Sequence, residues 1–306
     1  MQHAHVGKTR QNGAFVNPAG PVVVKVGGAA LDGPSESAMV AQAIAALHRV
    51  WPSGVVVVHG GGTEVDRHLG KLGLVSEKRE GIRITPRQHI DEIVAVLAGK
   101  VNKRLMGQIQ QQGVPAVGLC LGDGFLMRTV KAAHYLFEPG EVGQAAGGDP
   151  RVLQTLLPAG FLPVLCSIGL DGTGNPLNIN ADEAACDLAR LLGASNLVFL
   201  TDVPGVLDSA GNLIEELTPD EVEKFIECGT IHGGMIPKVR SALASAQAAR
   251  IPATIATWRD PASLSALGDG RVCGTCIHPS NESAASSNAN IADSTAQAAP
   301  PKGTSP

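Results

Sequence analysis

Runs of β-branched residues that end in glycine mark the predicted strands of this sequence. Residues 22–26 form one such run, VVVKV, which is broken by Lys25 and followed by Gly27 and Gly28. Residues 55–58 form a second run, VVVV, followed by His59 and three glycines. Near-continuous apolar runs are typical of parallel strands that are buried on both faces. The same signal predicts further strands at residues 116–119, 163–167 and 196–200, and a short β segment at 82–85.

Segments with apolar residues at helical spacing lie between these strands. They predict helices over residues 35–50, from 63, from 86 through 105, after 149, over 184–192, from the capping box at 218–221 to 226, and over 235–249. Turn residues at 122–124 and 171–175 predict two β-hairpins. With 306 residues, the chain is long enough for one large α/β domain or for two lobes that share a sheet.

Composition and charge narrow the class of partner. The net charge is -4, the pI is about 6.1, and no basic stripe is present, which argues against a nucleic-acid groove and favours a small-molecule partner. The six cysteines include Cys273 and Cys276 in a C-x-x-C, but no second pair or histidine follows at zinc spacing. We therefore expect reduced thiols, which fits a cytoplasmic protein.

The two ends of the chain differ in composition from the rest. Residues 1–20 lack the apolar core of a signal peptide, and no stretch of the chain reaches the length of a membrane-spanning segment, so we expect no membrane partner. Residues 279–306 are rich in Ser, Ala, Asn and Pro and have almost no large apolar side chain. We expect a disordered N-terminal extension over 1–20 and a disordered tail over 279–306.

Lys25 places a charge at the carboxyl end of a predicted strand, where open α/β sheets bind their ligands. The glycine turns at 27–28 and 60–62 offer free N–H groups that suit an anion such as phosphate, and two such turns in one sheet can converge on one anion. The alternative is a surface lysine before a tight turn. His59 is either a chemical group or a residue that helps to fix its turn.

Arg83 and Lys238 each have a plain interpretation and a functional one. Arg83 alternates with two isoleucines and either faces water or forms a bidentate clamp on a substrate carboxylate. Lys238 lies in the first turn of a predicted helix, an unfavourable position for a cation unless an anion binds there.

Asp182 also has two interpretations. It follows the N-cap residue Asn180 and lies in the first helical turn, where the helix dipole favours its charge. The functional alternative is that Asp182 and Asn178 face the same cleft as Lys25, with the carboxylate holding the ammonium group in place.

A series of segments between about residues 21 and 278 resembles, in unbroken order, the amino acid kinase family. They are VKVGGAAL, VVVHGGGTEVD, GIRITP, LAGKVNK, VGLCLGDG, LNINADEAA, LTDVPGVLD, GGMIPKV and a closing GT. Within the family they are similar to the branch that phosphorylates N-acetyl-L-glutamate in arginine biosynthesis. The LCLGDG segment resembles one branch of the family and departs from the commoner version, which has Ser, Gly and Lys in that loop.

The resemblance implies a fold and a domain plan. The fold is a three-layer αβα sandwich around a mostly parallel central sheet, spanning residues 21–278. Its N-terminal lobe, about 21–175, binds the acetylated amino acid, and its C-terminal lobe, about 176–278, binds ATP with Mg²⁺.

The resemblance also implies residue roles, position by position. The catalytic residues fall on Lys25, Lys238 and Asp182, with Asp182 organising the two lysines. The substrate-binding residues fall on Gly61, Gly62, Arg83 and Asn178. The nucleotide-binding residues fall on the glycine turn and two later segments: Gly27, Gly28, Asp202, Val203, Pro204, Gly205, Val206, Leu207, Thr230, Ile231 and His232.

The implied chemistry agrees with these residue types. A carboxylate is already a nucleophile at neutral pH, so phosphoryl transfer to it requires no general base. The difficulty is the meeting of two anions, which lysines, glycine N–H groups and Mg²⁺ can offset. We expect the ion to come with the nucleotide, and we expect no metal site built from protein ligands alone.

Two other interpretations stay open at this point. One is another kinase of the superfamily, acting on aspartate, carbamate, a nucleoside monophosphate or an aminoadipate carrier. The other is a non-catalytic arginine-sensing module. Arg83 together with Asn178 and Asp182 favours acetylglutamate, and the retention of both lysines argues against a module without catalysis.

The residues before Pro21 lead to a prediction about assembly. In this family the arginine-inhibited enzymes carry an amphipathic N-terminal helix that interlaces dimers into a hexamer. Here that stretch has few large apolar side chains and is interrupted by Gly7, Gly13 and Pro18, so it has no continuous apolar stripe. We predict a homodimer that physiological arginine does not inhibit. Deletion of residues 1–19 should leave the mass by light scattering and the activity unchanged, whereas a hexamer or strong inhibition by L-arginine would contradict the prediction.

Overall fold

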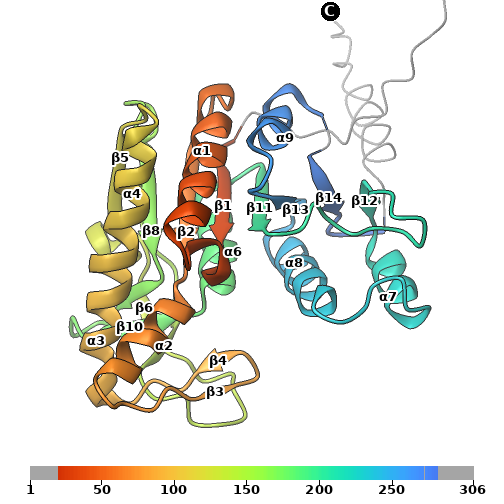
Figure 1. The fold of residues 1–306 in the computed structure, drawn as a ribbon. Helices are drawn as coiled ribbons and strands as arrows, with labels where there is room; N and C mark the ends of the chain where they lie inside the picture. The colour runs from red at the N-terminus through yellow and green to blue at the C-terminus, as the bar shows by residue number, and fades with distance from the viewer. Residues whose placement is uncertain (1–19, 272, 282–306) are drawn as a thin grey trace, which may run out of the picture.

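The computed structural model describes residues 20–271 and 273–281, and its largest element is an eight-stranded sheet (Figure 1). The strand order is β12-β14-β13-β11-β1-β2-β8-β5, and the pairs are parallel except for β13 with β14. Its strands are β1 Val22–Val26, β2 Val55–His59, β5 Ala116–Cys120, β8 Leu162–Cys166, β11 Asn196–Thr201, β12 Glu216–Leu217, β13 Ala253–Thr257 and β14 Gly274–Ile277. The mostly parallel sheet is confirmed. The expected extension and tail, apart from Gly20 and residues 279–281, lie outside the described residues.

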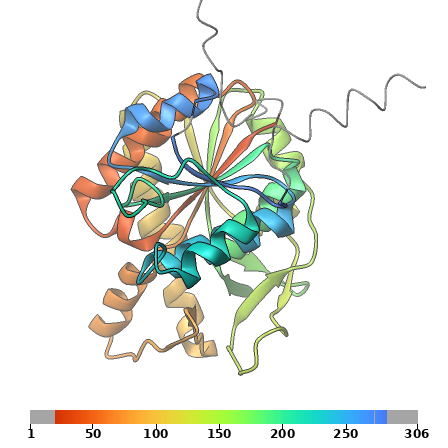
Figure 2. The ribbon, with the colours of Figure 1, turned by 90° about the vertical axis from the view of Figure 1, so that its right-hand side faces the viewer.

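Helices cover both faces of this sheet, which confirms the three-layer αβα architecture (Figures 1 and 2). One layer contains α1 Pro34–Val50, α2 Gly62–Lys71, α3 Ile90–Val94, α4 Asn102–Gln111 and α9 Pro261–Ala266. The other contains α5 Arg151–Leu156, α6 Ala181–Leu192, α7 Pro219–Glu227 and α8 Met235–Ala249. A π-helical segment, Ala95–Val101, joins α3 to α4, so the long helix predicted after Pro86 is continuous but not uniformly α-helical. The capping box of Thr218 and Glu221 is confirmed at the start of α7.

A smaller four-stranded sheet and a two-stranded hairpin lie beside the main sheet. The small sheet has the order β6-β7-β10-β9, with β6 Thr129–Lys131, β7 Val142–Ala145, β10 Pro176–Ile179 and β9 Ile168–Leu170, and the hairpin is β3 Lys78–Arg79 with β4 Ile82–Arg83. The antiparallel pair β9–β10 confirms the hairpin predicted at 171–175. The hairpin predicted at 122–124 is wrong, because β5 lies in the main sheet and β6 in the small one. Between them a 3₁₀ turn, Asp123–Phe125, with Gly124 at φ 60°, leads the chain out of the main sheet.

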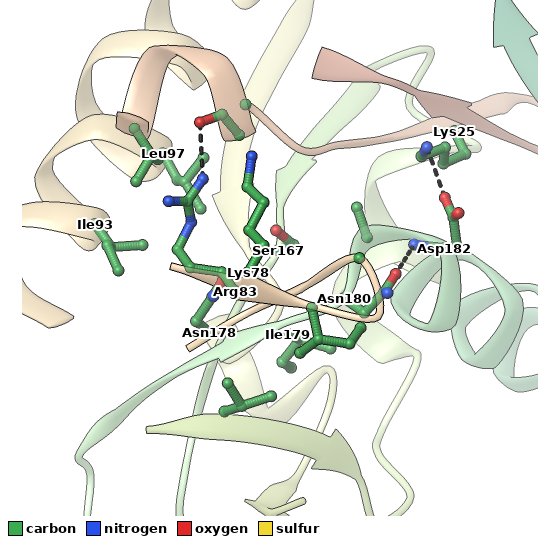
Figure 3. A pocket seen from close by; sticks show the side chains of 17 residues that line it. Lys25, Lys78, Arg83, Ile93, Leu97, Ser167, Asn178, Ile179, Asn180 and Asp182 are labelled. Carbon is green, nitrogen blue, oxygen red and sulfur yellow. Dashed lines mark hydrogen bonds and ion pairs between the residues drawn. The ribbon is translucent and has the colours of Figure 1, made fainter. Parts of the chain in front are cut away.

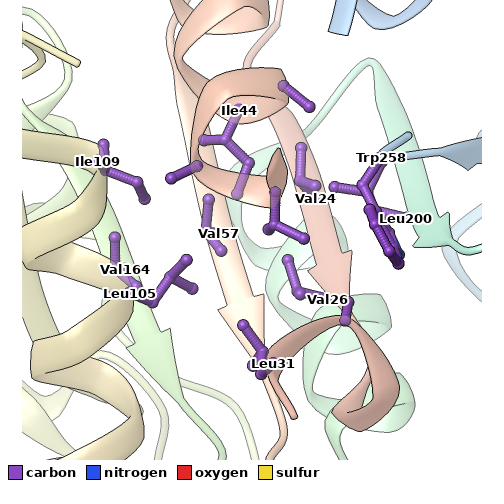
Figure 4. Close-up of a cluster of buried hydrophobic side chains, with 14 of the residues drawn as sticks. Val24, Val26, Leu31, Ile44, Val57, Leu105, Ile109, Val164, Leu200 and Trp258 are labelled. Carbon is purple, nitrogen blue, oxygen red and sulfur yellow. The ribbon is translucent and has the colours of Figure 1, made fainter. Parts of the chain in front are cut away.

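The alternation of side chains along β1 decides where its lysine points. Val22, Val24 and Val26 belong to the core beneath α1, whereas Val23 belongs to the core on the opposite face (Figure 4). Because successive side chains of a strand point to opposite faces, Lys25 shares the face of Val23. That face is covered by α6.

Packing against the sheet gives a prediction about stability. Ile44 of α1 is fully buried in the core over β1 and β2 (Figure 4). Truncation to Ala removes apolar contacts and leaves a cavity, so Ile44→Ala should lower the free energy of unfolding by about 2–5 kcal/mol. Leu136→Ala is the matched control, since Leu136 is 96% exposed and its truncation should change stability little. Chemical denaturation of both variants measures the difference, and equal stabilities would contradict this account of the core.

Candidate active site

An ion pair between Lys25 and Asp182 lies at the centre of the candidate site (Figure 3). The Lys25 Nζ is 2.6 Å from the Asp182 Oδ1, and both side chains are partly exposed. Lys25 comes from the carboxyl end of β1, and Asp182 from the first turn of α6, where Asn180 caps the helix by accepting the Asp182 N–H at 2.8 Å. The structure therefore contains both the helix cap and the contact with Lys25 that the functional interpretation requires. The cap orients the first turn so that the carboxylate faces the ammonium group.

Two cavities meet at this ion pair, since Lys25 and Asp182 line both of them. The first cavity has a volume of about 280 Å³, and the second about 260 Å³. A group bound in one cavity thus lies next to a group bound in the other, with the Lys25 ammonium between them.

The first cavity contains all four residues expected to bind the substrate, namely Gly61, Gly62, Arg83 and Asn178. Its apolar wall includes Ile93 of α3 and Leu97 of the π-helical segment (Figure 3). Gly61 has a φ of 159°, and a Cβ added to it would lie 2.9 Å from Leu97 Cδ2. Because glycine has no Cβ, the turn can pack closely against this wall. The cavity also includes residues 178–182, which lie beyond the boundary near 175 expected between the lobes.

Arg83 is held in place by groups from α2 and from the loop before β3. Its Nη2 donates to the Gly62 carbonyl at 2.8 Å, and its Nη1 contacts the Asp66 carboxylate and the Ser76 hydroxyl. Burial works to raise the pKa of Asp66, but hydrogen bonds from Arg83, Lys78 and Ser76 lower it to about 2. The carboxylate is therefore ionised at neutral pH and orients the guanidinium. The arginine side chain is buried. The interpretation in which Arg83 simply faces water is therefore wrong.

Asn178 lies on β10, and its Nδ2 donates to the Thr85 hydroxyl at 3.1 Å. Thr85 is fully buried, and its own hydroxyl donates to the Arg83 carbonyl at 3.1 Å. These bonds connect Asn178 to the segment that carries Arg83. The two residues therefore line one cavity although they are far apart in sequence.

The second cavity lies between the Gly27–Gly28 turn and the start of α8. Its lining includes both glycines, Asp202 and Lys238, together with Thr201 and Trp258. A Cβ placed on Gly28 would be 3.4 Å from the backbone N of Gly62, so the two glycine turns lie next to each other, as predicted. Anions in this region would be close to the N–H groups of both turns.

Lys238 pairs with Asp202 in this structure, with its Nζ 2.8 Å from the Asp202 Oδ1. The hydrogen bond from Lys238 is the main reason that the pKa of Asp202 is lowered. Asp182 contacts Lys25, and its Oδ2 accepts a hydrogen bond at 2.9 Å from Ser241, three residues after Lys238 on α8. The two lysines thus have separate carboxylate partners here, and Ser241 connects Asp182 to the helix that carries Lys238.

Within the part of the chain that the structure describes, the remaining expected nucleotide residues are not among those that line the second cavity. In the 202–207 turn, Gly205 and Val206 are buried, and the Val206 N–H donates to the Thr275 hydroxyl at 2.8 Å. Val203 is half-buried, whereas Pro204 and Leu207 are exposed. In the second segment, Thr230 is half-buried, Ile231 is buried and His232 is exposed.

His59 has a structural position in the described fold. Its ring is fully buried, its Nδ1 is 2.7 Å from the Gly60 carbonyl and its Nε2 is 3.0 Å from Asn102 Nδ2. Burial, partly opposed by the hydrogen bond to Gly60, lowers the pKa of His59 to about 4. The ring is therefore neutral at pH 7. This supports the interpretation that His59 fixes the glycine turn.

Sequence reasoning missed several residues that line or support the cavities. Ser167 and Thr201 follow or end predicted strands, so the strand-end rule that found Lys25 would have found them as well. Lys78, on β3, also lines the first cavity, and no sequence pattern indicated it.

Two further residues support the site without having been predicted. Asp66 forms an ion pair with Arg83, and Ser241 donates a hydrogen bond to Asp182. Only the tertiary structure brings these partners into contact.

The cysteines are free thiols in the structure, and Cys228 is exposed while Cys273 and Cys276 are buried. Among the described residues, no group of three or more His, Cys, Asp or Glu side chains is arranged to hold a metal ion. The helices of residues 20–271 and 273–281 include none with the length and hydropathy needed to cross a membrane.

Comparisons with known proteins identify the family of this chain. The sequence profile of the amino acid kinase family matches residues 20–257. The acetylglutamate kinases of Pectobacterium atrosepticum and Proteus mirabilis are 42% and 41% identical over 257 residues, which cover 84% of this chain and 98% of each relative. A solved protein from Streptococcus mutans is 28% identical, with a TM-score of 0.66, over 85% of this chain and 98% of its own. Carbamate kinase from Giardia lamblia shares the fold, with a TM-score of 0.60 at 20% identity, over 85% of this chain and 99% of its own. This chain therefore belongs to the amino acid kinase family.

Proposed function

We propose that this chain transfers the γ-phosphoryl group of ATP to the side-chain carboxylate of N-acetyl-L-glutamate. The product is N-acetyl-L-glutamyl 5-phosphate, formed in the second step of arginine biosynthesis. The observation that carries the proposal is the pair of cavities that share Lys25 and Asp182. The names of the relatives favour this substrate over those of the other kinases and over a non-catalytic arginine-sensing module.

The first cavity is proposed to bind N-acetyl-L-glutamate. Arg83 would hold one carboxylate, because its guanidinium is already oriented by Asp66 and by the Gly62 carbonyl. Asn178 and the N–H groups of Gly61 and Gly62 would bind the remaining polar groups. The side-chain carboxylate would then point towards Lys25, at the boundary between the cavities.

The second cavity is proposed to bind the phosphates of ATP. Gly27 and Gly28 supply backbone N–H groups, and Lys238 supplies a charge from the first turn of α8. A phosphate next to Lys238 would offset the unfavourable position of a cation at a helix N-terminus. The rest of the nucleotide would extend past Asp202 along residues 203–207 and 230–232.

The reaction needs charge stabilisation more than acid–base catalysis. A carboxylate oxygen forms a bond to the γ-phosphorus, the bond from that phosphorus to the bridging oxygen breaks, and ADP leaves. Lys25 and Lys238 would stabilise the charge on the transferring group, and Asp182 would hold Lys25 in position. The neutral, hydrogen-bonded His59 is not required.

Mg²⁺ is proposed to enter with the nucleotide. This ion is usually bound through one or two carboxylates plus phosphate oxygens and waters. The second cavity offers two carboxylates, Asp182 and Asp202, and each is paired with a lysine. This donor set fits an ion held mainly by phosphates, where it would neutralise charge on the transferring group.

The proposal also includes the oligomeric state and the cellular location of the enzyme. We propose a homodimer, because the residues before Pro21 lack the continuous apolar stripe of a hexamer-forming helix, and a cytoplasmic enzyme. Light scattering measures the mass of the assembly, and fractionation of cells that produce the protein measures its location.

A coupled assay of ATP consumption tests the proposed reaction. N-acetyl-L-glutamate should support turnover, whereas L-aspartate, carbamate and an N-acetylated aminoadipate should support much less. The acyl phosphate should be trapped by hydroxylamine in amounts that match the ADP formed. Faster turnover with another acceptor would replace the proposed substrate, and no turnover with any acceptor would favour the non-catalytic alternative.

The two lysines give the first prediction from this proposal. Lys25→Ala or Lys238→Ala should lower kcat by about two orders of magnitude or more, because each removes a charge that stabilises the transition state. Folding should survive, as thermal denaturation can verify. Arg240→Ala is the matched control on α8, since its exposed side chain pairs with Glu223 away from the cavities. Near-normal turnover in a well-folded Lys238→Ala variant would reject the assigned role.

Arg83 gives the second prediction. Arg83→Lys should raise the KM for N-acetyl-L-glutamate much more than the KM for ATP, because a single ammonium cannot reproduce the planar guanidinium fork. Steady-state kinetics with each substrate varied in turn measure both constants. Arg87→Lys is a suitable control, because Arg87 is exposed and is not among the cavity-lining residues of the described chain. Equal effects on the two constants would count against the carboxylate clamp.

A further inference from the structure

Cys120 and Cys166 end two neighbouring strands of the main sheet. Cys120 is the last residue of β5 and Cys166 the last of β8, and the parallel register pairs them directly. Residues paired in this way point to the same face of the sheet. Their sulfur atoms are 3.5 Å apart, with the Cys166 thiol donating to Cys120.

The backbone spacing at this pair suits a disulfide. Adjacent strands lie about 4.7–4.9 Å apart, and disulfides join residues whose Cα atoms are roughly 4.4–6.8 Å apart. Only the side chains have to rotate to bring the two sulfurs into bonding distance.

The two thiols differ in accessibility and in acidity. Cys120 is half-buried, whereas Cys166 is fully buried. The hydrogen bond from Cys166 is the main cause that lowers the pKa of Cys120, and the same bond, with burial, raises the pKa of Cys166. Cys120 is therefore the more accessible and the more acidic of the two thiols, and Cys166 lies directly beside it.

We propose that Cys120 and Cys166 form a site of reversible oxidation to a disulfide by a hydroperoxide. The Cys120 thiolate attacks the peroxide oxygen, which gives a sulfenic acid and, with H₂O₂, one water after protonation. The Cys166 sulfur then attacks the sulfenic sulfur, loses its proton and displaces the hydroxyl group as a second water. Two thiols lose two electrons in total, and the peroxide is reduced to two waters.

The position of the pair connects this oxidation to the first cavity. Cys166 is followed directly by Ser167, which lines that cavity. On its other side, Cys166 is paired with His59, which precedes the glycine turn of the same cavity. Gly61 and Gly62 after β2 and Ser167 after β8 line the first cavity, whereas within the described chain the second cavity takes no lining residue from the segments that directly follow β2, β5 or β8. Disulfide formation should therefore weaken binding in the first cavity more than in the second, an effect whose kinetic readout rests on the proposed function.

Peptide mapping tests the disulfide without any assay of activity. The background is the Cys228→Ser variant, which removes the exposed lone thiol. After treatment with a stoichiometric amount of H₂O₂, denaturation, alkylation and digestion should yield a cross-linked peptide pair containing Cys120 and Cys166. Dithiothreitol should abolish it. In the same background, Cys166→Ser should yield no cross-link and should leave Cys120 as a sulfenic acid that dimedone traps.

Two results would overturn the site. One is recovery of both cysteines as alkylated thiols after complete consumption of the peroxide, and the other is their separate oxidation without a cross-link. A circular dichroism spectrum of each variant verifies folding, and Cys120→Ala offers a second variant that also removes the cross-link.

Kinetics test the consequence for the cavity. The oxidised Cys228→Ser protein should show a several-fold higher KM for N-acetyl-L-glutamate, a much smaller change in the KM for ATP, and recovery with dithiothreitol. Unchanged constants in fully cross-linked protein would overturn the effect on the cavity. If the reduced protein does not phosphorylate N-acetyl-L-glutamate, the proposed function fails, whereas the mapping still decides whether the disulfide forms.

Discussion

The ion pair between Lys25 and Asp182 is the interaction on which the arrangement of the site depends. It joins the end of β1, in the centre of the main sheet, to the beginning of α6 on one face. Both residues are fixed by local structure, Lys25 by the alternation of a buried strand and Asp182 by the helix cap at Asn180. Their contact divides the space above the sheet into two cavities that share one ammonium group.

Other cations of the site also form ion pairs with a carboxylate. Lys238 pairs with Asp202, and Arg83 with Asp66, so each cation that faces a cavity has a carboxylate partner from another element. Such partners restrict the rotamers of long side chains before a ligand arrives, which reduces the entropy lost on binding. They also compensate the positive charge that would otherwise gather where two strands, two glycine turns and two helix N-termini meet. An incoming phosphate can then compete with Asp202 for Lys238.

Short-range patterns in the sequence predicted the parallel strands and the residues at their ends, whereas the three-layer architecture was implied by the family resemblance. The valine runs required buried parallel strands, and the parallel arrangement required their carboxyl ends to share an edge. The hairpin at 122–124 was wrong because a local turn signal does not say which sheet the next strand joins. The support of Arg83 by Asp66 and of Asp182 by Ser241 was not predicted, because each bond spans residues whose proximity only the tertiary fold creates.

The position of His59 indicates the kind of chemistry that this site favours. It is the titratable residue closest in sequence to the glycine turn of the first cavity, and it would be the first candidate for a general base. Its ring nitrogens are instead engaged by Gly60 and Asn102, and burial keeps it neutral. The groups that do line both cavities are an ammonium and a carboxylate that neutralise each other. A site built in this way stabilises the charges of bound groups, which is what phosphoryl transfer between two anions requires.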